Sequence, residues 1–175
     1  MKKQTDLKQN IETGKLVYIA MLIALSFVGA LINIPGTSIA LDSMPGFFAA
    51  LFLGPGLGAI VAALGHLITA AYRGFYLTLP LHIIIGFLMA FSAYMFGWIY
   101  QRTNGVIASI IAIILNGPVS LLIIVLSSLL IGIENGGWVL FTTLITPLTL
   151  AATVNVFLAY GVFKALKRNK IGDKI

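Results

Sequence analysis

Long apolar runs alternate with short polar or glycine- and proline-containing breaks along almost the whole chain. A run of about 18 or more apolar residues is typical of a membrane-spanning helix, because the hydrocarbon core of a bilayer is about 30 Å thick. The pattern predicts an all-α, polytopic membrane protein with six transmembrane helices in a single domain over residues 1–175. We expect helices at residues 15–32, 43–53, 57–72, 79–100, 106–133 and 138–166, between a polar N-terminus at 1–14 and a basic tail at 167–175.

Glycine and proline residues set the predicted helix ends. A turn at Asn33–Gly36 ends the first helix, and Gly54–Gly56 joins the second helix to the third. The second helix is short and covers only about half of a ~30 Å core, so neighbouring segments must cover the rest. Asn116–Pro118 interrupts the fifth helix, and Pro147 predicts a kink in the sixth.

The distribution of charge fits this topology. Only 9% of the residues are charged and 59% are hydrophobic, which leaves too few polar side chains to cover a soluble protein. The net charge of +6 comes mostly from basic residues before the first helix and after the last, which predicts that both termini are cytoplasmic in a cell membrane. This arrangement gives no support for nucleic-acid binding. Arg102 also falls on the cytoplasmic side, whereas Arg73 falls on the outer side against this bias.

A small group of polar residues interrupts the apolar pattern. Polar side chains in membrane spans are costly and usually face a bundle interior or a cavity. Asp42 falls in an outer loop, and Asn155 lies deeper, where it is expected to join Asn116 at the floor of the same cavity. Aromatic residues near the outer helix ends offer stacking surfaces for a planar ligand. We therefore expect a substrate-binding pocket formed by Asp42, His66, Arg73, Tyr76, His82 and Asn116.

Each of these residues also has a purely structural interpretation. An aspartate before a helix is often a cap, a membrane histidine can hydrogen-bond a neighbouring helix, and an arginine at the boundary can anchor a helix to the headgroups. Asn116 beside Gly117-Pro118 fits a kink as well as a ligand contact, and Glu134 in its glycine-rich turn fits a solvated loop. The functional interpretation depends on the shared depth of the group rather than on any one member.

Motifs for chemistry are missing from the sequence. It contains no cysteine, no HExxH, no Gly-x-Ser-x-Gly and no Walker sequence. We therefore expect no catalytic residue, no metal site and no cofactor in this chain, and we expect any ATP that drives its activity to be hydrolysed by partner proteins.

Small residues recur in the first predicted helix. Ala20 and Ala24 lie one turn apart, and Gly29 and Ala30 follow, which predicts small residues on one face of the helix. Such faces let another helix approach closely. We expect this face to dock a partner protein.

The residues above resemble a known family of membrane proteins. Ala20-x-x-x-Ala24, the segment from Leu41 to Phe47, and the turn from Leu53 to Ala59 followed by Leu64-Gly65-His66 are similar to the S components of energy-coupling factor (ECF) vitamin transporters. The resemblance covers nearly the whole chain. Together with the segment from Leu77 to His82, these residues look most like the branch proposed to import α-ribazole, a nucleoside precursor of cobalamin.

The resemblance implies a function and a set of partners. Such an S component captures a vitamin from outside the cell, docks through its alanine face on a membrane scaffold subunit bound to two ATPases, and topples to release the vitamin inside. It implies a multi-pass protein of a bacterial cell membrane, in contact with lipid and with no cofactor of its own. For α-ribazole, Asp42 and Asn116 would bind the ribose hydroxyls, and His66 and aromatic rings would meet the benzimidazole.

Three alternatives stay open at the level of the sequence. The ligand is another vitamin, such as pantothenate, pyridoxine or another small aromatic vitamin. The chain is a stand-alone membrane enzyme that uses its two histidines. It is a solitary facilitator or structural subunit.

Overall fold

All regular elements of the protein are helices. The computed structural model describes residues 2–32, 40–133 and 137–169, with side chains from Thr13 onward. Within these residues the chain forms no β-strand, which confirms the all-α prediction. The elements are α1 (Lys2–Leu31), α2 (Met44–Phe52), α3 (Pro55–Tyr72), α4 (Leu79–Tyr100), α5 (Gly105–Ile114), the π-helical turn η1 (Leu115–Val119), α6 (Ser120–Ile131) and α7 (Trp138–Arg168).

The six predicted helices are present, because α5, η1 and α6 follow one another without a break. Five helical stretches of the described chain are long and apolar enough to cross a membrane, and they occupy residues 13–31, 55–72, 79–100, 105–131 and 138–168. The sixth helix, α2, has 9 residues. At 1.5 Å per residue it extends about 14 Å, so it does not span a bilayer alone.

The first helix is longer than the apolar pattern predicts. It begins at Lys2 rather than at residue 15, so the predicted start is wrong. Residues 2–13 include three lysines, two glutamines, a leucine and a glutamate, which are good helix formers, and the lone Gly14 does not end the helix. The predicted turn at Asn33–Gly36 and the turn that contains Glu134 lie outside the described residues.

The short helix α2 forms the centre of the bundle. All residues from Pro45 to Ala50 are buried, and α2 packs against α1, α3, α4 and α7. Close approach depends on small residues: a Cβ added to Gly58 of α3 would collide with the backbone of Ala50. A Cβ added to Gly65, also on α3, would lie 2.6 Å from Ser26 Oγ of α1. These packed glycines place α3 directly against both α1 and α2.

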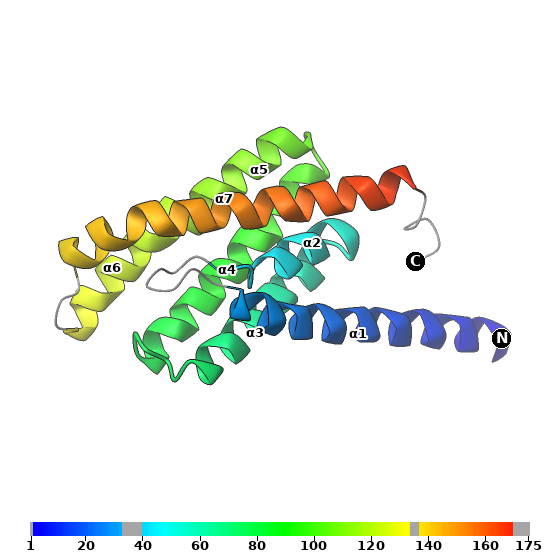
Figure 1. Ribbon diagram of the computed structural model, residues 1–175. Coiled ribbons are helices and arrows are strands. Elements are labelled where there is room, and N and C mark those ends of the chain that lie inside the picture. Colours follow the sequence, from blue (N-terminus) through cyan, green and yellow to red (C-terminus); the bar gives the residue numbers. More distant parts are fainter. Residues whose placement is uncertain (1, 33–39, 134–136, 170–175) are drawn as a thin grey trace.

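The connections fall at two ends of the bundle. In Figure 1 the start of α1 and the end of α7 lie toward the same end, together with the α4–α5 connection. The turn between α3 and α4 lies toward the other end, with the end of α6 and the start of α7. This alternation is the one that the predicted topology requires.

The predicted interruption of the fifth helix is a π turn rather than a break. Pro118 has no N–H, so it cannot donate the usual helical hydrogen bond. The Ser120 backbone N–H donates to the Leu115 carbonyl, five residues earlier, and the Ser120 hydroxyl donates to the same carbonyl at 2.7 Å. π turns of this kind often occur at functional sites. The other internal proline, Pro147, lies within the continuous helix α7.

Candidate functional site

A cavity lies near the end of the bundle that carries the α3–α4 turn. It is lined by residues that precede α2 and by residues of α3, the α3–α4 turn, α4, η1, α6 and α7. The wall is apolar on the side of α6 and α7, where Leu121, Leu144 and Leu148 contribute. Its polar lining residues are Asp42, Ser43, His66, Thr69, Arg73, Tyr76, His82, Asn116 and Ser120.

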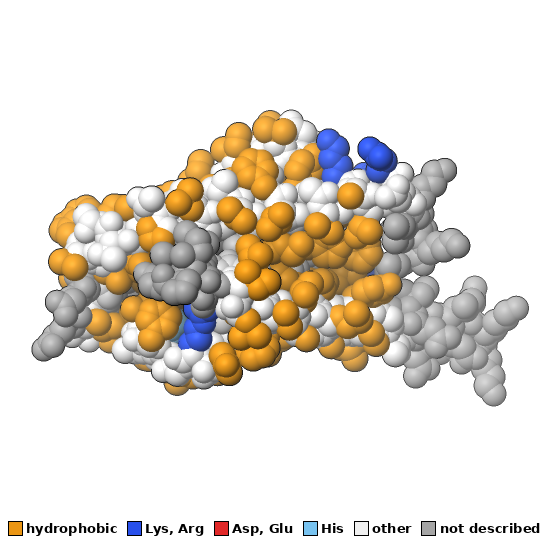
Figure 2. Space-filling model, in the orientation of Figure 1, with side chains coloured by type: hydrophobic (Ala, Val, Ile, Leu, Met, Phe, Trp, Pro, Cys, Tyr) orange, Lys and Arg blue, Asp and Glu red, His pale blue; other side chains and the backbone are white. Residues whose placement is uncertain are grey.

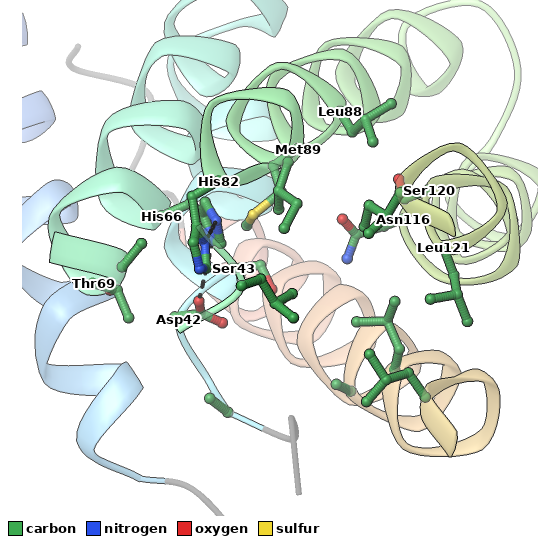
Figure 3. A pocket seen from close by; sticks show the side chains of 18 of the residues that line it. Asp42, Ser43, His66, Thr69, His82, Leu88, Met89, Asn116, Ser120 and Leu121 are labelled. Atoms are coloured by element: carbon green, nitrogen blue, oxygen red, sulfur yellow. Dashed lines mark hydrogen bonds and ion pairs between the residues drawn. The ribbon is translucent and has the colours of Figure 1, made fainter. Parts of the chain in front are cut away.

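The structure brings together all six residues that the sequence analysis proposed for the pocket. Figure 3 shows Asp42, His66 and His82 on one side of the cavity and Asn116 and Ser120 on the other. The six residues come from separate segments: the residues before α2, the helices α3 and α4, the turn between them, and η1. Convergence from so many segments is what a binding site requires, and it is not a consequence of hydropathy alone.

Asp42, His66 and His82 form a row along one wall. Asp42 Oδ2 lies 4.0 Å from His66 Nδ1. His66 Nε2 lies 3.2 Å from His82 Nδ1, a hydrogen-bonding distance. His82 is 2% exposed, and its Nε2 atom is buried without a partner among the described residues. Buried polar atoms are almost always hydrogen-bonded, so this unpaired nitrogen is the unsatisfied end of the row.

Aromatic rings flank the end of this row. The rings of Phe75 and Tyr76 meet the His82 ring edge-on, with centroids 5.7 and 5.2 Å away. Both belong to the short turn between α3 and α4, in which Phe75 and Thr78 have positive φ angles of 50° and 102°. Such strained residues cluster at ligand sites. Tyr76 is 62% exposed, so it provides a stacking surface where the cavity meets the outside of the protein.

The surroundings of the Asp42 carboxyl act on its pKa in opposite directions. Burial raises its pKa above the ordinary value of 3.8, while hydrogen bonds from its own backbone N–H and from Ser43 and the nearby Arg73 charge act in the opposite direction. The carboxylate can therefore orient the neighbouring imidazole or accept hydrogen bonds from a ligand, and its protonation depends on what fills the cavity.

Arg73 has a structural partner as well as a place in the cavity wall. Its Nη2 donates to the Ala30 carbonyl at 2.6 Å. Ala30 lies in the last turn of α1, where carbonyls lack helical partners. This bond joins α1 to α3 and uses only one of the donors of the guanidinium.

Asn155 does not line the cavity, contrary to the expectation that it forms part of the floor. It is fully buried, and its amide nitrogen donates to the carbonyls of Ala40 and Ala151 at 2.7 and 2.8 Å. Its Oδ1 accepts from the Met44 N–H at 2.8 Å. Asn155 therefore fixes the segment that leads into α2, which indirectly positions Asp42.

Three polar lining residues, Ser43, Thr69 and Ser120, were missed by sequence reasoning, and Ser43 directly follows Asp42. Thr69 lies one turn after His66 on α3, and its buried hydroxyl has no partner in the described part of the chain. Ser120 lies four residues after Asn116 and so shares its helix face. Helical spacing from residues already chosen is the signal that would have identified Thr69 and Ser120.

The expected docking face on α1 is only partly as predicted. Ala20 and Ala24 are exposed, as a docking face requires. Gly29 and Ala30 are buried, and the Gly29 carbonyl accepts a hydrogen bond from the Leu41 N–H at 3.2 Å. The expectation of a single face is wrong, because five residues along a helix rotate a side chain by about 140°.

The described residues contain no group of three or more histidine, cysteine or acidic side chains placed to hold a metal ion.

The fold and the cavity together define a polytopic helical membrane protein with a polar, aromatic-flanked cavity near one end.

Comparison with known proteins gives the family. The family model for the substrate-specific component of ECF transporters matches residues 14–167. The chain therefore belongs to the family of ECF transporter substrate-specific components, which bind the substrate and work with ECF scaffold and ATPase modules.

A solved structure shares the fold. The S component of a bacterial ECF transporter matches with a TM-score of 0.70 at 19% sequence identity, over 90% of this chain and 97% of that chain. No curated protein sequence matches this chain.

Proposed function

We propose that this S component captures α-ribazole in the cavity and delivers it to an ATP-driven importer. The observation that carries the proposal is the convergence of Asp42, His66, Arg73, Tyr76, His82 and Asn116 on one cavity in a chain of this family.

The chemistry of the cavity suits a neutral aromatic nucleoside. Tyr76 and His82 offer ring surfaces for a benzimidazole, and Met89 and Leu88 extend the apolar wall. Asn116 lies across the cavity from His66 and His82, where its amide can bind hydroxyl groups of a ribose. Its side chain makes no hydrogen bond within the described residues, so it is free for a ligand.

Partners supply the energy for transport. We propose that Ala20 and Ala24, which are exposed on α1, dock on a membrane scaffold subunit that carries two ATPases. The chain then acts as a multi-pass protein of a bacterial cell membrane with both termini in the cytoplasm. It uses no cofactor of its own.

A binding experiment with purified protein in nanodiscs tests the substrate. Isothermal titration with α-ribazole, pantothenate and pyridoxine ranks the candidates, and native mass spectrometry identifies any small molecule that is retained during purification. Preference for pantothenate or pyridoxine would replace the α-ribazole assignment. Turnover of a ligand by the isolated protein would instead support a stand-alone enzyme.

Variants test the location of the site. Asp42→Ala, His66→Ala and His82→Ala should each weaken binding about tenfold or more, because each removes a polar group in a partly dry cavity. Ser109→Ala is a matched control, since the Ser109 hydroxyl is also buried without a partner but lies outside the cavity lining. If all three cavity variants bind within about twofold of the wild type, the site lies elsewhere.

A further inference from the structure

We infer that Asp42, His66 and His82 form a hydrogen-bonding relay of fixed direction, which ends in an unprotonated nitrogen of His82, a residue of the cavity wall. The cavity would then select ligands that present an O–H or N–H donor to His82. The inference deepens the proposed function and rests on it in one respect, namely that a ligand occupies this cavity. It assigns the three residues a shared role in specificity rather than three separate contacts.

The geometry connects the three side chains in sequence. Asp42 Oδ2 faces His66 Nδ1 at 4.0 Å, and the other ring nitrogen of His66 faces His82 Nδ1 at 3.2 Å. Figure 3 shows the two rings side by side above Asp42, with dashed lines along this path. His82 Nε2 lies at the far end of the path, buried and without a partner among the described residues.

The Asp42 carboxylate sets the direction in which hydrogen bonds are donated from His82 to His66. In a neutral imidazole one nitrogen carries the proton and the other is an acceptor, and the choice depends on the partner of each. A carboxylate near His66 Nδ1 favours the proton on that nitrogen, because a bare lone pair there would face negative charge. His66 Nε2 is then an acceptor, and the short contact requires His82 to donate from Nδ1. His82 Nε2 is left as a bare acceptor.

The surrounding charges support this direction. Burial raises the pKa of Asp42, and Arg73, which lines the same cavity, opposes this effect and favours the ionised form. Tyr76, the other titratable residue in the lining, packs edge-on against the His82 ring and so leaves the direction of the relay unchanged. A ligand hydroxyl or N–H that meets Nε2 would satisfy the last unpaired atom of the row, whereas a ligand carbonyl or ether at the same place would face a second lone pair.

Ring-nitrogen NMR tests the direction without any ligand. The chain contains two histidines, so protein labelled with ¹⁵N-histidine and carrying a histidine-free affinity tag gives only four ring-nitrogen signals. The His66→Gln variant assigns them. We expect both Nδ1 atoms to be protonated and both Nε2 atoms to be bare in the ligand-free protein in nanodiscs. A protonated His82 Nε2 would overturn the inference.

Two variants test whether Asp42 determines the tautomers of the two histidines. Asp42→Ala removes the carboxylate and should move a measurable fraction of His82 into the tautomer protonated at Nε2. Thr69→Val is the matched control: it changes another buried polar group of the cavity wall and should leave all four signals in place. Unchanged tautomers in Asp42→Ala would show that Asp42 does not set the direction, and would overturn that part of the inference.

A pair of substitutions tests the recognition of the donor. Gln places an oxygen near the position of imidazole Nε2, whereas Asn reaches only to that of Nδ1. His82→Gln should therefore keep an affinity for α-ribazole at least about tenfold higher than His82→Asn. Equal loss in both variants, or binding that leaves the Nε2 signal unmoved, would contradict donor recognition. If α-ribazole does not bind the wild type, the proposed substrate fails, and the ligand-free spectrum alone decides the inference.

Discussion

The Arg73 guanidinium donates a hydrogen bond to the Ala30 carbonyl at 2.6 Å and thereby joins the C-terminal turns of α3 and α1 beside the cavity. This contact gives a physical reason for a basic residue at the end of the bundle where the sequence bias disfavours one. Arg73 also faces the cavity and lies close enough to Asp42 to lower its pKa against the larger effect of burial. One side chain therefore serves both the fold and the site.

The Arg73–Ala30 bond gives the first prediction. Arg73→Gln should lower the free energy of unfolding by about 2 kcal/mol, since hydrogen bonds from charged donors contribute about 1.5–3 kcal/mol. The measurement is thermal unfolding in detergent micelles followed by circular dichroism. Arg102→Gln is the control, because Arg102 also donates to a backbone carbonyl, that of Trp98 at 3.1 Å, but does so locally on the surface. Equal effects of the two substitutions would show that the bond between helices carries no special stability.

Two asparagines of the bundle should respond in opposite ways to the same substitution. Asn155→Leu removes the side-chain partner of the Met44 N–H and of the Ala40 carbonyl and should destabilise the protein by about 2–4 kcal/mol. Asn116→Leu places an apolar group in the cavity and should keep the stability within about 1 kcal/mol while weakening ligand binding. Thermal unfolding and titration on both variants check the pair. The reverse pattern would mean that Asn155 serves the ligand and Asn116 the fold.

The contrast between these asparagines shows where sequence reasoning ends. Membrane hydropathy predicted the helices, because each span must bury its own backbone polar groups in a helix. Depth along the helices predicted the six residues of the cavity, because polar side chains in membrane spans turn inward. Depth alone cannot tell an asparagine that faces a cavity from one that holds a loop, since that difference depends on partners 111 and 115 residues away.

The predictions for the start of α1 and for a single face of small residues on it were wrong for related reasons. The apolar run marks where the helix meets lipid, but propensity extends the helix further to Lys2. The grouping of Gly29 with Ala20 ignored helical rotation, and the structure uses Gly29 for a close contact with Leu41 inside the protein. The π turn at Leu115–Val119 was visible only as an interruption, because the sequence does not specify how the neighbouring backbone compensates for Pro118.

The exposed alanines of α1 give a prediction about partners. Ala20→Leu together with Ala24→Leu should abolish uptake and copurification with the scaffold and ATPase subunits, because bulky side chains prevent close helix packing. Binding of ligand by the isolated protein should stay within about twofold of the wild type, since neither residue lines the cavity. Ala165→Leu is the control, because Ala165 is an exposed alanine on another helix, α7. Loss of binding in the double variant would assign these alanines to the fold instead.

The raised pKa of Asp42 makes a prediction about pH. Because burial holds the pKa of this carboxyl above 3.8, the folded protein keeps its proton at pH values where the unfolded chain has released it. Stability therefore falls as the pH rises from about 3.8 through the folded pKa. Asp42→Asn is neutral at every pH and should unfold at a higher temperature than the wild type at pH 7.5, with the difference vanishing below pH 3.8. The same variant should bind ligand more weakly at pH 7.5, because the carboxylate that orients His66 is gone. A difference in unfolding temperature that stays constant over this pH range would show that ionisation of Asp42 has no cost in the folded protein.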